Sequence, residues 1–246
     1  MCSIPSNRQL NHRATNGRRV SSANRYQGSG CSTGSPGCGA RLFYERHASD
    51  RGAGQRPRLH EEPAQLEDVL DACMAQAGWE VRVVSRAEAA LEIAARRGAR
   101  CVQEQGGALL AAIDQAQGDV RGRQSHLAVV LADLPLLTAP GLARGLALGA
   151  NASVVAAPAH SDGGTNLLIR RPPSAIAARF GRSSFSRHRA EAYRRGVTFQ
   201  EARIAELAFD LDRPADIRRV LESPRASRTR AVCLDLGLAA RLSEHV

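Results

Sequence analysis

The sequence predicts an α/β domain with a mostly parallel sheet, and three observations carry this prediction. From residue 63 onward, helical and extended patterns alternate along the chain, which is typical of parallel strands joined by crossover helices. Residues 126–132 (HLAVVLA) form an almost wholly apolar run, as expected of a strand buried on both faces. The 246 residues, 43% of them hydrophobic, suffice for a sizeable core without crosslinks.

The first half of the domain starts with the clearest element, a helix over residues 64–77. Its apolar residues share one face, and Gly78 ends the pattern. The elements expected next are a strand at 81–84, a helix at 87–97, a strand at 100–102, a helix at 107–115 and the strand at 126–132. Because the last of these is the best buried strand, we expect it at the centre of the sheet.

The second half continues the alternation. We expect helices at 142–148, 184–195 and 214–221, strands at 153–157, 166–170 and 198–202, and one last helix at 234–242. The predicted organisation is therefore a disordered segment at 1–60, a domain at 61–222 and a tail at 223–246 that carries this last helix.

Residues 1–60 differ from the rest in charge. They hold ten Arg against Glu45 and Asp50, which accounts for most of the formal net charge of +10. Few of their side chains could build a core, so we expect a disordered basic segment. A basic arm that tracks phosphates, a solvated tail and an out-of-frame translation are the alternatives. Nucleic-acid binding is disfavoured because aromatic residues for base stacking are nearly absent from this segment.

Cysteine usage and hydropathy exclude several classes of protein. The six Cys are scattered without a CxxC pair, and no apolar signal sequence opens the chain, which predicts a reducing cytoplasm and no structural zinc. No stretch approaches the roughly 18 uninterrupted apolar residues of a membrane span, so we expect no membrane partner. All 34 basic residues are Arg, which removes lysine from the candidate catalytic groups.

An acidic residue follows the predicted central strand. Asp133 lies in the sequence ADLP directly after that strand, and ligands of open α/β sheets bind at the carboxyl ends of strands. A carboxylate there suits Mg²⁺, which takes one or two carboxylates together with substrate phosphates. The alternative is that Asp133 only caps the turn before the next helix.

A second acidic segment is FDLDRP at residues 209–214. In extended backbone Asp210 and Asp212 point to the same side, and paired carboxylates repel unless a cation or a hydrogen-bond network lies between them. Asp212 could instead be the N-cap of a helix with Pro214 in its first turn. That alternative leaves Asp210 unexplained.

Two glycine-containing loops are candidate anion sites. DGGTN at residues 162–166 combines paired glycines with the short donors Thr165 and Asn166, which suits a phosphate nest, although any hairpin turn could carry the same residues. FGRSSF at residues 180–185 opens a helix, and the N–H groups of a helix start favour an anion. An ordinary N-cap at Ser183 or Ser184 is the alternative.

Four motifs stand in order along the chain: ADLPLLTAPGL, DGGTNLLIRRPPSAI, FGRSSFSRHRAEA and FDLDRPADI. In order and spacing they resemble the guanylyltransferases that build the deazaflavin coenzyme F-420, often called 2-phospho-L-lactate guanylyltransferases. The resemblance spans about Leu66 to Leu221 and implies a Rossmann-like nucleotidyltransferase domain. The molybdenum-cofactor guanylyltransferases are related to this family.

The resemblance also implies a reaction. GMP passes from GTP to the phosphate of 2-phospho-L-lactate, phosphoenolpyruvate or 3-phosphoglycerate, and pyrophosphate is released. Because the attacking group is the acid's own phosphate oxygen, no general base is required, and we expect His160 and His188 at the surface. The implied partners are GTP and the phosphorylated three-carbon acid, with Mg²⁺ as cofactor and a homodimer as the candidate assembly.

Site residues follow from the matching motifs. Asp133 is the implied catalytic residue, and it holds Mg²⁺ with Asp210 or Asp212. The other implied contacts are Thr165, Gly181 and Ser184 for the acid, and Gly106 and Gly107 for the nucleotide.

The resemblance does not extend to the N-terminal segment. Members of the family begin with an apolar strand and a loop that carries basic residues, typically two lysines, and residues 1–60 match neither. The chain also lacks the Asn that the family places near Leu110. We therefore expect a sheet without its first strand and little guanylyltransferase activity. The functional alternatives are another nucleotidyltransferase of similar fold and a nucleic-acid-binding protein.

Overall fold

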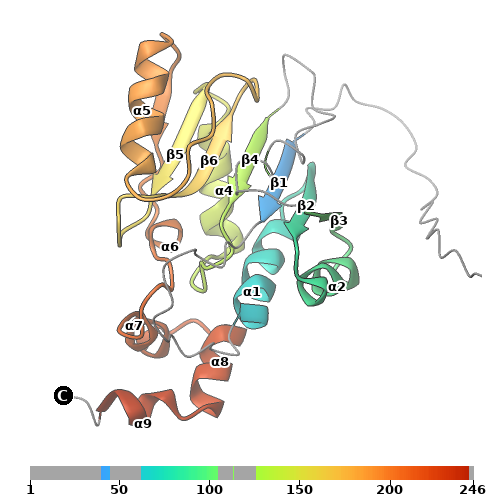
Figure 1. The fold of residues 1–246 in the computed structure, drawn as a ribbon, viewed down its shortest axis with the longest axis vertical. Coiled ribbons are helices and arrows are strands. Elements are labelled where there is room, and N and C mark those ends of the chain that lie inside the picture. Colours follow the sequence, from blue (N-terminus) through green and yellow to red (C-terminus); the bar gives the residue numbers. More distant parts are fainter. Residues whose placement is uncertain (1–39, 45–61, 105–112, 114–125, 244–246) are drawn as a thin grey trace, which may run out of the picture. The chain divides into compact units, whose positions relative to one another are not determined.

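The computed structural model describes residues 40–44, 62–104, 113 and 126–243, all within the compact unit Gly37–Val246 (Figure 1). The disorder expected for residues 1–60 falls on residues 1–39 and 45–60, outside this part, except for residues 40–44, which form a strand. The expected helix at 107–115 also lies outside it, apart from residue 113. Among the described helices none is long and apolar enough to cross a membrane.

A seven-stranded sheet with the order β3-β2-β1-β4-β6-β5-β7 forms the centre of the unit. Only β6 runs antiparallel to its neighbours β4 and β5, and the other pairs are parallel. The predicted α/β class with a mostly parallel sheet is confirmed. The strands are β1 (Ala40–Tyr44), β2 (Trp79–Ser85), β3 (Arg100–Gln103), β4 (Leu127–Val130), β5 (Val154–Pro158), β6 (Thr165–Arg170) and β7 (Phe199–Glu201).

Strand β1 shows that the expected loss of the first strand is wrong. It pairs in parallel with β2 along its whole length and with β4 on its other side. The sequence ARLFY lies in an Arg-rich segment and gives a weak strand signal. Phe43 and Tyr44 belong to residue types that favour strands, and the two neighbouring strands satisfy the backbone of β1 on both sides.

Strand β4 lies at the centre of the sheet, as predicted. All four of its residues are buried, and alternate side chains point to opposite faces. Ala128 and Val130 join the core cluster that includes α1 and α4, whereas Leu127 and Val129 join a cluster on the other face. Helices cover both faces, which explains the continuous apolar run.

Helices α1 (Glu62–Met74), α2 (Glu88–Arg96), α4 (Ala139–Leu148) and α5 (Ser184–Arg194) correspond to predicted elements. Helix α4 approaches the sheet closely at Gly145, where an added Cβ would come within 2.9 Å of the Leu167 side chain and 3.0 Å of Leu207. The short helix α6 (Ala205–Ala208), which contributes Leu207, was not predicted.

The C-terminal region contains more helix than the sequence indicates. Helix α7 (Asp216–Glu222) confirms the helix expected at 214–221, whereas two helices, α8 (Arg228–Asp235) and α9 (Leu238–Ser243), stand where one was expected at 234–242. Gly237 separates α8 from α9 with a φ of 64°, a conformation that glycine adopts readily at helix ends. A separate apolar cluster that includes Phe209, Leu211 and Cys233 connects these helices to the acidic segment 209–214.

Candidate active site

Asp133 lies just beyond the carboxyl end of β4 and is half-buried. The fully buried side chains of Leu134 and Leu137 anchor the loop that follows it. The N-cap of α4 is Thr138, whose hydroxyl accepts a hydrogen bond of 3.0 Å from the backbone N–H of Gly141. Thr138, and not Asp133, is therefore the residue that caps this helix.

The acidic segment 209–214 lies beside Asp133. The backbone N–H of Leu211 donates to the carbonyl oxygen of Asp133 over 2.9 Å, so the segments that carry the two predicted groups of carboxylates are in contact. Helix α7 begins at Asp216, and the Asp216 carboxylate accepts from the backbone N–H groups of Asp212 (3.1 Å) and Arg213 (2.7 Å). Asp212 is therefore not the N-cap.

Asp210 is a buried carboxylate with acidic neighbours. Burial raises its pKa above the ordinary value, and the negative charges of Asp212 and Asp162 raise it further, while a 2.9 Å hydrogen bond donated by Ser161 lowers it. Like charges gathered in this way favour a cation between them. A bound cation would therefore relieve an electrostatic cost that the fold carries here.

The carboxylates of Asp133, Asp210 and Asp212 are candidate Mg²⁺ ligands that would act together with substrate phosphates. In the described part of the chain, no group of three or more His, Cys, Asp or Glu side chains is arranged to hold a metal ion, so a cage built by the protein alone is not present there. Mg²⁺ commonly binds through one or two carboxylates and completes its coordination with water and substrate phosphates. The number of carboxylates carried by the two contacting segments is in keeping with this mode of binding.

The DGGTN loop is the turn of the hairpin between β5 and β6, so the hairpin alternative is correct. Within the turn, the Asp162 carboxylate accepts from the backbone N–H of Gly164 over 2.7 Å. The Asn166 side-chain amide donates to the Leu207 carbonyl oxygen over 2.9 Å, so this amide holds α6 instead of facing a phosphate. The antiparallel register shifts by one residue between Ala157, which pairs with Leu167, and Pro158, which pairs with Thr165.

The start of α5 rests on this hairpin. The backbone N–H of Ser183 donates to the Asp162 carbonyl oxygen over 3.2 Å, and that of Phe185 donates to Gly163 over the same distance. The N-cap is Ser183, without a side-chain capping bond. Gly181 has a φ of +100° and open space where a Cβ would stand. Because the Phe185 amide is already engaged, this helix start presents fewer free N–H groups than predicted.

Three buried side chains form a chain of hydrogen bonds behind these loops. The Ser184 hydroxyl donates to Thr165 Oγ1 over 2.9 Å, Thr165 Oγ1 lies 3.1 Å from His188 Nδ1, and the Arg179 backbone N–H donates to His188 Nε2 over 2.8 Å. The structure thus brings together Thr165 and Ser184, two of the residues expected at the acid site. Gly181 is also adjacent, since its carbonyl oxygen accepts from the Ser184 N–H over 3.0 Å.

His188 was expected at the surface, and this expectation is wrong, whereas His160 is exposed as expected. Burial, together with the positive charges of Arg170, Arg187 and Arg179, lowers the pKa of His188 to about 4. The sequence held one clue, because His188 follows Ser184 by four residues on α5 and therefore shares its helix face.

The two predicted groups of site residues meet through the hairpin turn. Ser161 contacts Asp210, and the next residue, Asp162, contacts Ser183. A single loop therefore joins the carboxylates to the hydroxyl pair at the carboxyl edge of the central strands, where open α/β sheets bind ligands. Gly106 and Gly107, the predicted nucleotide contacts, lie outside the described residues.

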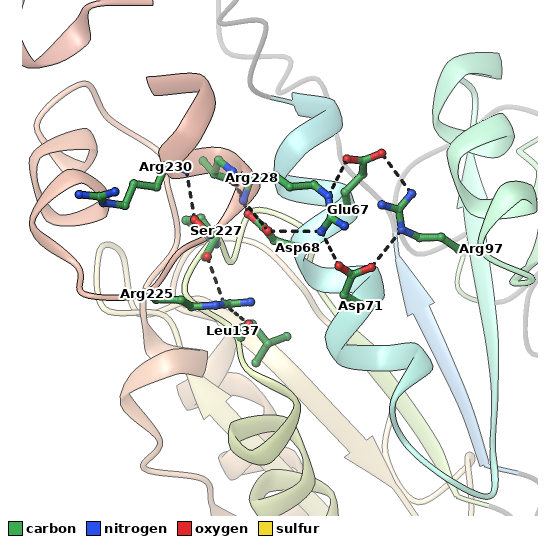
Figure 2. A network of polar contacts seen from close by, with 11 residues as sticks. Glu67, Asp68, Asp71, Arg97, Leu137, Arg225, Ser227, Arg228 and Arg230 are labelled. Carbon is green, nitrogen blue, oxygen red and sulfur yellow. Dashed lines mark hydrogen bonds and ion pairs between the residues drawn. The ribbon is translucent and has the colours of Figure 1, made fainter. Parts of the chain in front are cut away.

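Figure 2 shows a polar network that fixes the C-terminal helices next to this edge. The Asp68 carboxylate on α1 accepts from the backbone N–H groups of Arg228 (2.9 Å) and Thr229 (3.0 Å) and from the Thr229 hydroxyl (2.7 Å). Arg225 donates to the carbonyl oxygen of Leu137 and, over 3.3 Å, to that of Pro135. Arg225 thereby holds the loop that follows Asp133, and the sequence reasoning identified neither Asp68 nor Arg225.

Comparison with known proteins places this site in a family. The family model described as "Guanylyl transferase CofC like" matches residues 57–244, which is most of the chain. The chain belongs to this family. Its members are nucleotidyltransferases, so the resemblance predicted from the four motifs is confirmed, and the CofC-like assignment covers all site residues described above.

Named relatives support the CofC-like assignment. A phosphoenolpyruvate guanylyltransferase from Sphaerobacter thermophilus is 39% identical over 141 residues, which cover 57% of this chain and 68% of that protein. A 3-phospho-D-glycerate guanylyltransferase from Phenylobacterium zucineum is 35% identical over 179 residues, which cover 70% of this chain and 82% of that protein.

A solved structure supports the fold. A protein from Desulfovibrio desulfuricans G20, described as a nucleotide-diphospho-sugar transferase, aligns with a TM-score of 0.62 at 15% identity. The alignment covers 83% of this chain and 98% of that one. At this level of identity the likeness concerns the nucleotidyltransferase fold alone.

Proposed function

We propose that this CofC-like protein transfers GMP from GTP to the phosphate of a three-carbon acid, namely phosphoenolpyruvate, 3-phosphoglycerate or 2-phospho-L-lactate. An oxygen of the acid's phosphate forms a bond to the α-phosphorus of GTP, and the bond from that phosphorus to the departing pyrophosphate breaks. The observation that carries the proposal is the meeting of a carboxylate group and a hydroxyl pair along one hairpin turn. Such a reaction requires positioning and charge neutralisation more than a protein nucleophile.

In this proposal the carboxylates serve the nucleotide phosphates. Asp133 with Asp210 or Asp212 would hold Mg²⁺, which when bound supplies positive charge to the phosphates. Asp210 is already destabilised as an anion by burial and by its acidic neighbours, so its carboxylate favours a cation. Gly106 and Gly107 complete the nucleotide side of the proposed site.

The hydroxyl pair serves the acid. Thr165 and Ser184 lie 2.9 Å apart, and their neighbours Gly163 and Gly181 are exposed, which leaves the backbone open on that side. A buried hydroxyl favours a hydrogen-bonding partner, and a phosphate or carboxylate oxygen is a strong one. The acid therefore binds against α5, and its phosphate faces the carboxylates across the turn.

Pyrophosphate release from GTP with each of the three acids, measured on the full chain, tests this function. We expect release with at least one acid and a marked preference for GTP over CTP and ATP. Asp133→Asn should abolish Mg²⁺-dependent release without changing the far-ultraviolet circular dichroism spectrum. Turnover by Asp133→Asn at the wild-type rate would remove Asp133 from the mechanism.

Ser184→Ala tests the assignment of one half of the site to GTP and the other to the acid. It should raise KM for the acid and leave KM for GTP unchanged, because the lost hydroxyl donates to Thr165, on the acid side of the proposed site. The expected loss is about 0.5–1.5 kcal/mol, the value of one neutral hydrogen bond. Ser186→Ala is the matched control, since the Ser186 hydroxyl is exposed and donates to the Ser183 carbonyl oxygen. A rise in KM for GTP alone would show that the two halves are assigned the wrong way round.

A further inference from the structure

The hydrogen bonds of His188 fix where its proton lies. Its Nε2 atom accepts from the backbone N–H of Arg179 over 2.8 Å, so Nε2 carries no hydrogen. A neutral imidazole has one N–H and one acceptor nitrogen, and the low pKa of His188, about 4, keeps the ring neutral at physiological pH. The hydrogen therefore sits on Nδ1, 3.1 Å from Thr165 Oγ1.

This tautomer decides the direction of the hydroxyl pair. Because Nδ1–H can only donate, Thr165 Oγ1 must accept from His188. It also accepts from the Ser184 hydroxyl over 2.9 Å, and these two bonds use both of its lone pairs. The hydrogen of the Thr165 hydroxyl is used by neither bond and can point to a ligand oxygen. With the other tautomer, Thr165 would have to donate its hydroxyl hydrogen to Nδ1, and this hydrogen would no longer be available to a ligand.

The surroundings of His188 hold the ring in place. The side chain is fully buried, and the Phe180 ring packs edge-on against it with centroids 5.6 Å apart. Phe180 and Arg179 precede α5, whereas Thr165 begins β6, so the imidazole connects two separate parts of the proposed acid site. Because the ring lies between the Arg179 backbone N–H and the Thr165 hydroxyl, only the tautomer with hydrogen on Nδ1 satisfies both contacts.

We propose that His188 is a positioning residue for the phosphorylated acid, because its Nδ1–H group directs the Thr165 hydroxyl hydrogen toward an oxygen of that acid. The inference rests on the proposed function for the identity of the ligand. His188 does not itself take up or release a proton in the reaction. Its effect is on acid binding and not on the nucleotide.

Two substitutions separate this role from a purely structural one. In His188→Asn the side-chain amide can replace Nδ1–H as the donor to Thr165, whereas in His188→Gln the longer side chain reaches the position of Nε2 and provides no donor near Thr165. Both remove the ring, so a loss of packing affects both. His126→Gln is the matched control, since His126 lies at the start of β4, where its Nε2 atom contacts the Gly149 carbonyl oxygen over 3.1 Å.

The experiment measures calorimetric affinities of the full chain for GTP and for each of the three acids, with inorganic phosphate as a simpler probe. We expect about a tenfold weaker acid affinity in His188→Gln, equivalent to about 1.4 kcal/mol, and a smaller change in His188→Asn. GTP affinity should stay constant in both variants, and His126→Gln should match the wild type. Equal acid affinities in His188→Gln and the wild type would overturn the proposal, as would equal losses in both His188 variants.

A spectroscopic readout is independent of activity. Long-range ¹H–¹⁵N spectra of the wild-type protein should show a protonated Nδ1 and an unprotonated Nε2 for His188, and a protonated Nε2 would overturn the proposal. Failure of the proposed function has a different signature. In that case the wild type itself would bind none of the acids, while the tautomer would still report whether His188 donates to Thr165.

Discussion

Replacing Asp68 should destabilise the fold far more than replacing its neighbour Glu67. Asp68 is 2% exposed, and its carboxylate accepts three hydrogen bonds from the first turn of α8, about 160 residues away in the sequence. Asp68→Ala leaves these donors buried without their acceptor. A hydrogen bond to a charged group contributes about 1.5–3 kcal/mol, so at the lower value the three together give about 4–5 kcal/mol.

Glu67 provides the comparison. Its carboxylate forms ion pairs with Arg97 (3.1 Å) and Arg228 (3.2 Å), but the Arg228 side chain is about half exposed and can be rehydrated. Pairs of this kind contribute at most about 1 kcal/mol. The two adjacent residues on α1 therefore differ several-fold in their expected effect, although both are acidic and both contact Arg228.

Thermal unfolding followed by circular dichroism at pH 7 distinguishes the two substitutions. For a chain of this size each kcal/mol shifts the midpoint by about 2–4 °C, so Asp68→Ala should lower it by about 10 °C or more and Glu67→Ala by only a few degrees. Equal shifts in the two variants would refute the reasoning, because they would show that the bonds to the α8 backbone contribute no more than an exposed ion pair.

Three further predictions concern the site. The pKa of Asp210 is raised in the folded protein, so its ionised form lowers stability as the pH rises through that pKa. Asp210→Asn should therefore raise the thermal unfolding midpoint at pH 7 and lose this advantage near pH 4. The same substitution should reduce Mg²⁺-dependent turnover. The pKa of His188 is lowered to about 4 in the folded protein, so the contribution of the neutral ring to the free energy of unfolding is complete above pH 6.5 and is lost as the pH falls toward 4. Denaturant titrations should show that the free energy of unfolding of the wild type falls by about 3 kcal/mol more than that of His188→Asn over this range. Arg225→Ala should lower kcat by freeing the loop after Asp133, whereas Arg230→Ala, which removes a 3.1 Å bond to the Leu221 carbonyl oxygen, should leave kcat unchanged; equal kcat values in the two variants would contradict this role.

Local patterns sufficed for most of the fold. The central strand was predicted because burial on both faces leaves a continuous apolar run, and α1 because its apolar face has helical spacing. Strand β1 was missed because ARLFY is a short run inside an Arg-, Gly- and Ser-rich segment, whose composition predicted disorder, and its pairing with β2 and β4 is visible only in the fold. Helix α8 was missed although Ser227 is a local N-cap whose hydroxyl oxygen accepts from the Arg230 backbone N–H over 3.1 Å. The further bonds from the Arg228 and Thr229 N–H groups to Asp68 on α1 come from a distant part of the sequence.

The site residues also differ in whether the local sequence identifies them. Asp133 was singled out because it follows a recognisable strand, whereas the roles expected of Thr165 and Ser184 came from the family resemblance. The role of His188 was missed because its partner Thr165 lies 23 residues away, and only the folded hairpin brings them together. Arg225 was missed because it binds backbone carbonyl oxygens, which carry no residue-specific signal in a sequence.

The reversed direction of β6 has a consequence for how this enzyme could change its acceptor. Because β6 runs against β4 and β5, its first residue, Thr165, reaches the same edge of the sheet as the end of β4. In the proposed site, where Thr165 binds the acid and Asp133 serves GTP, the turn at residues 159–164 would set the gap between the two substrates. Insertion or deletion of a residue there would move the acid relative to GTP while Asp133 stays in place. A change in the length of one turn is therefore a simple route by which relatives could come to accept acids of different size.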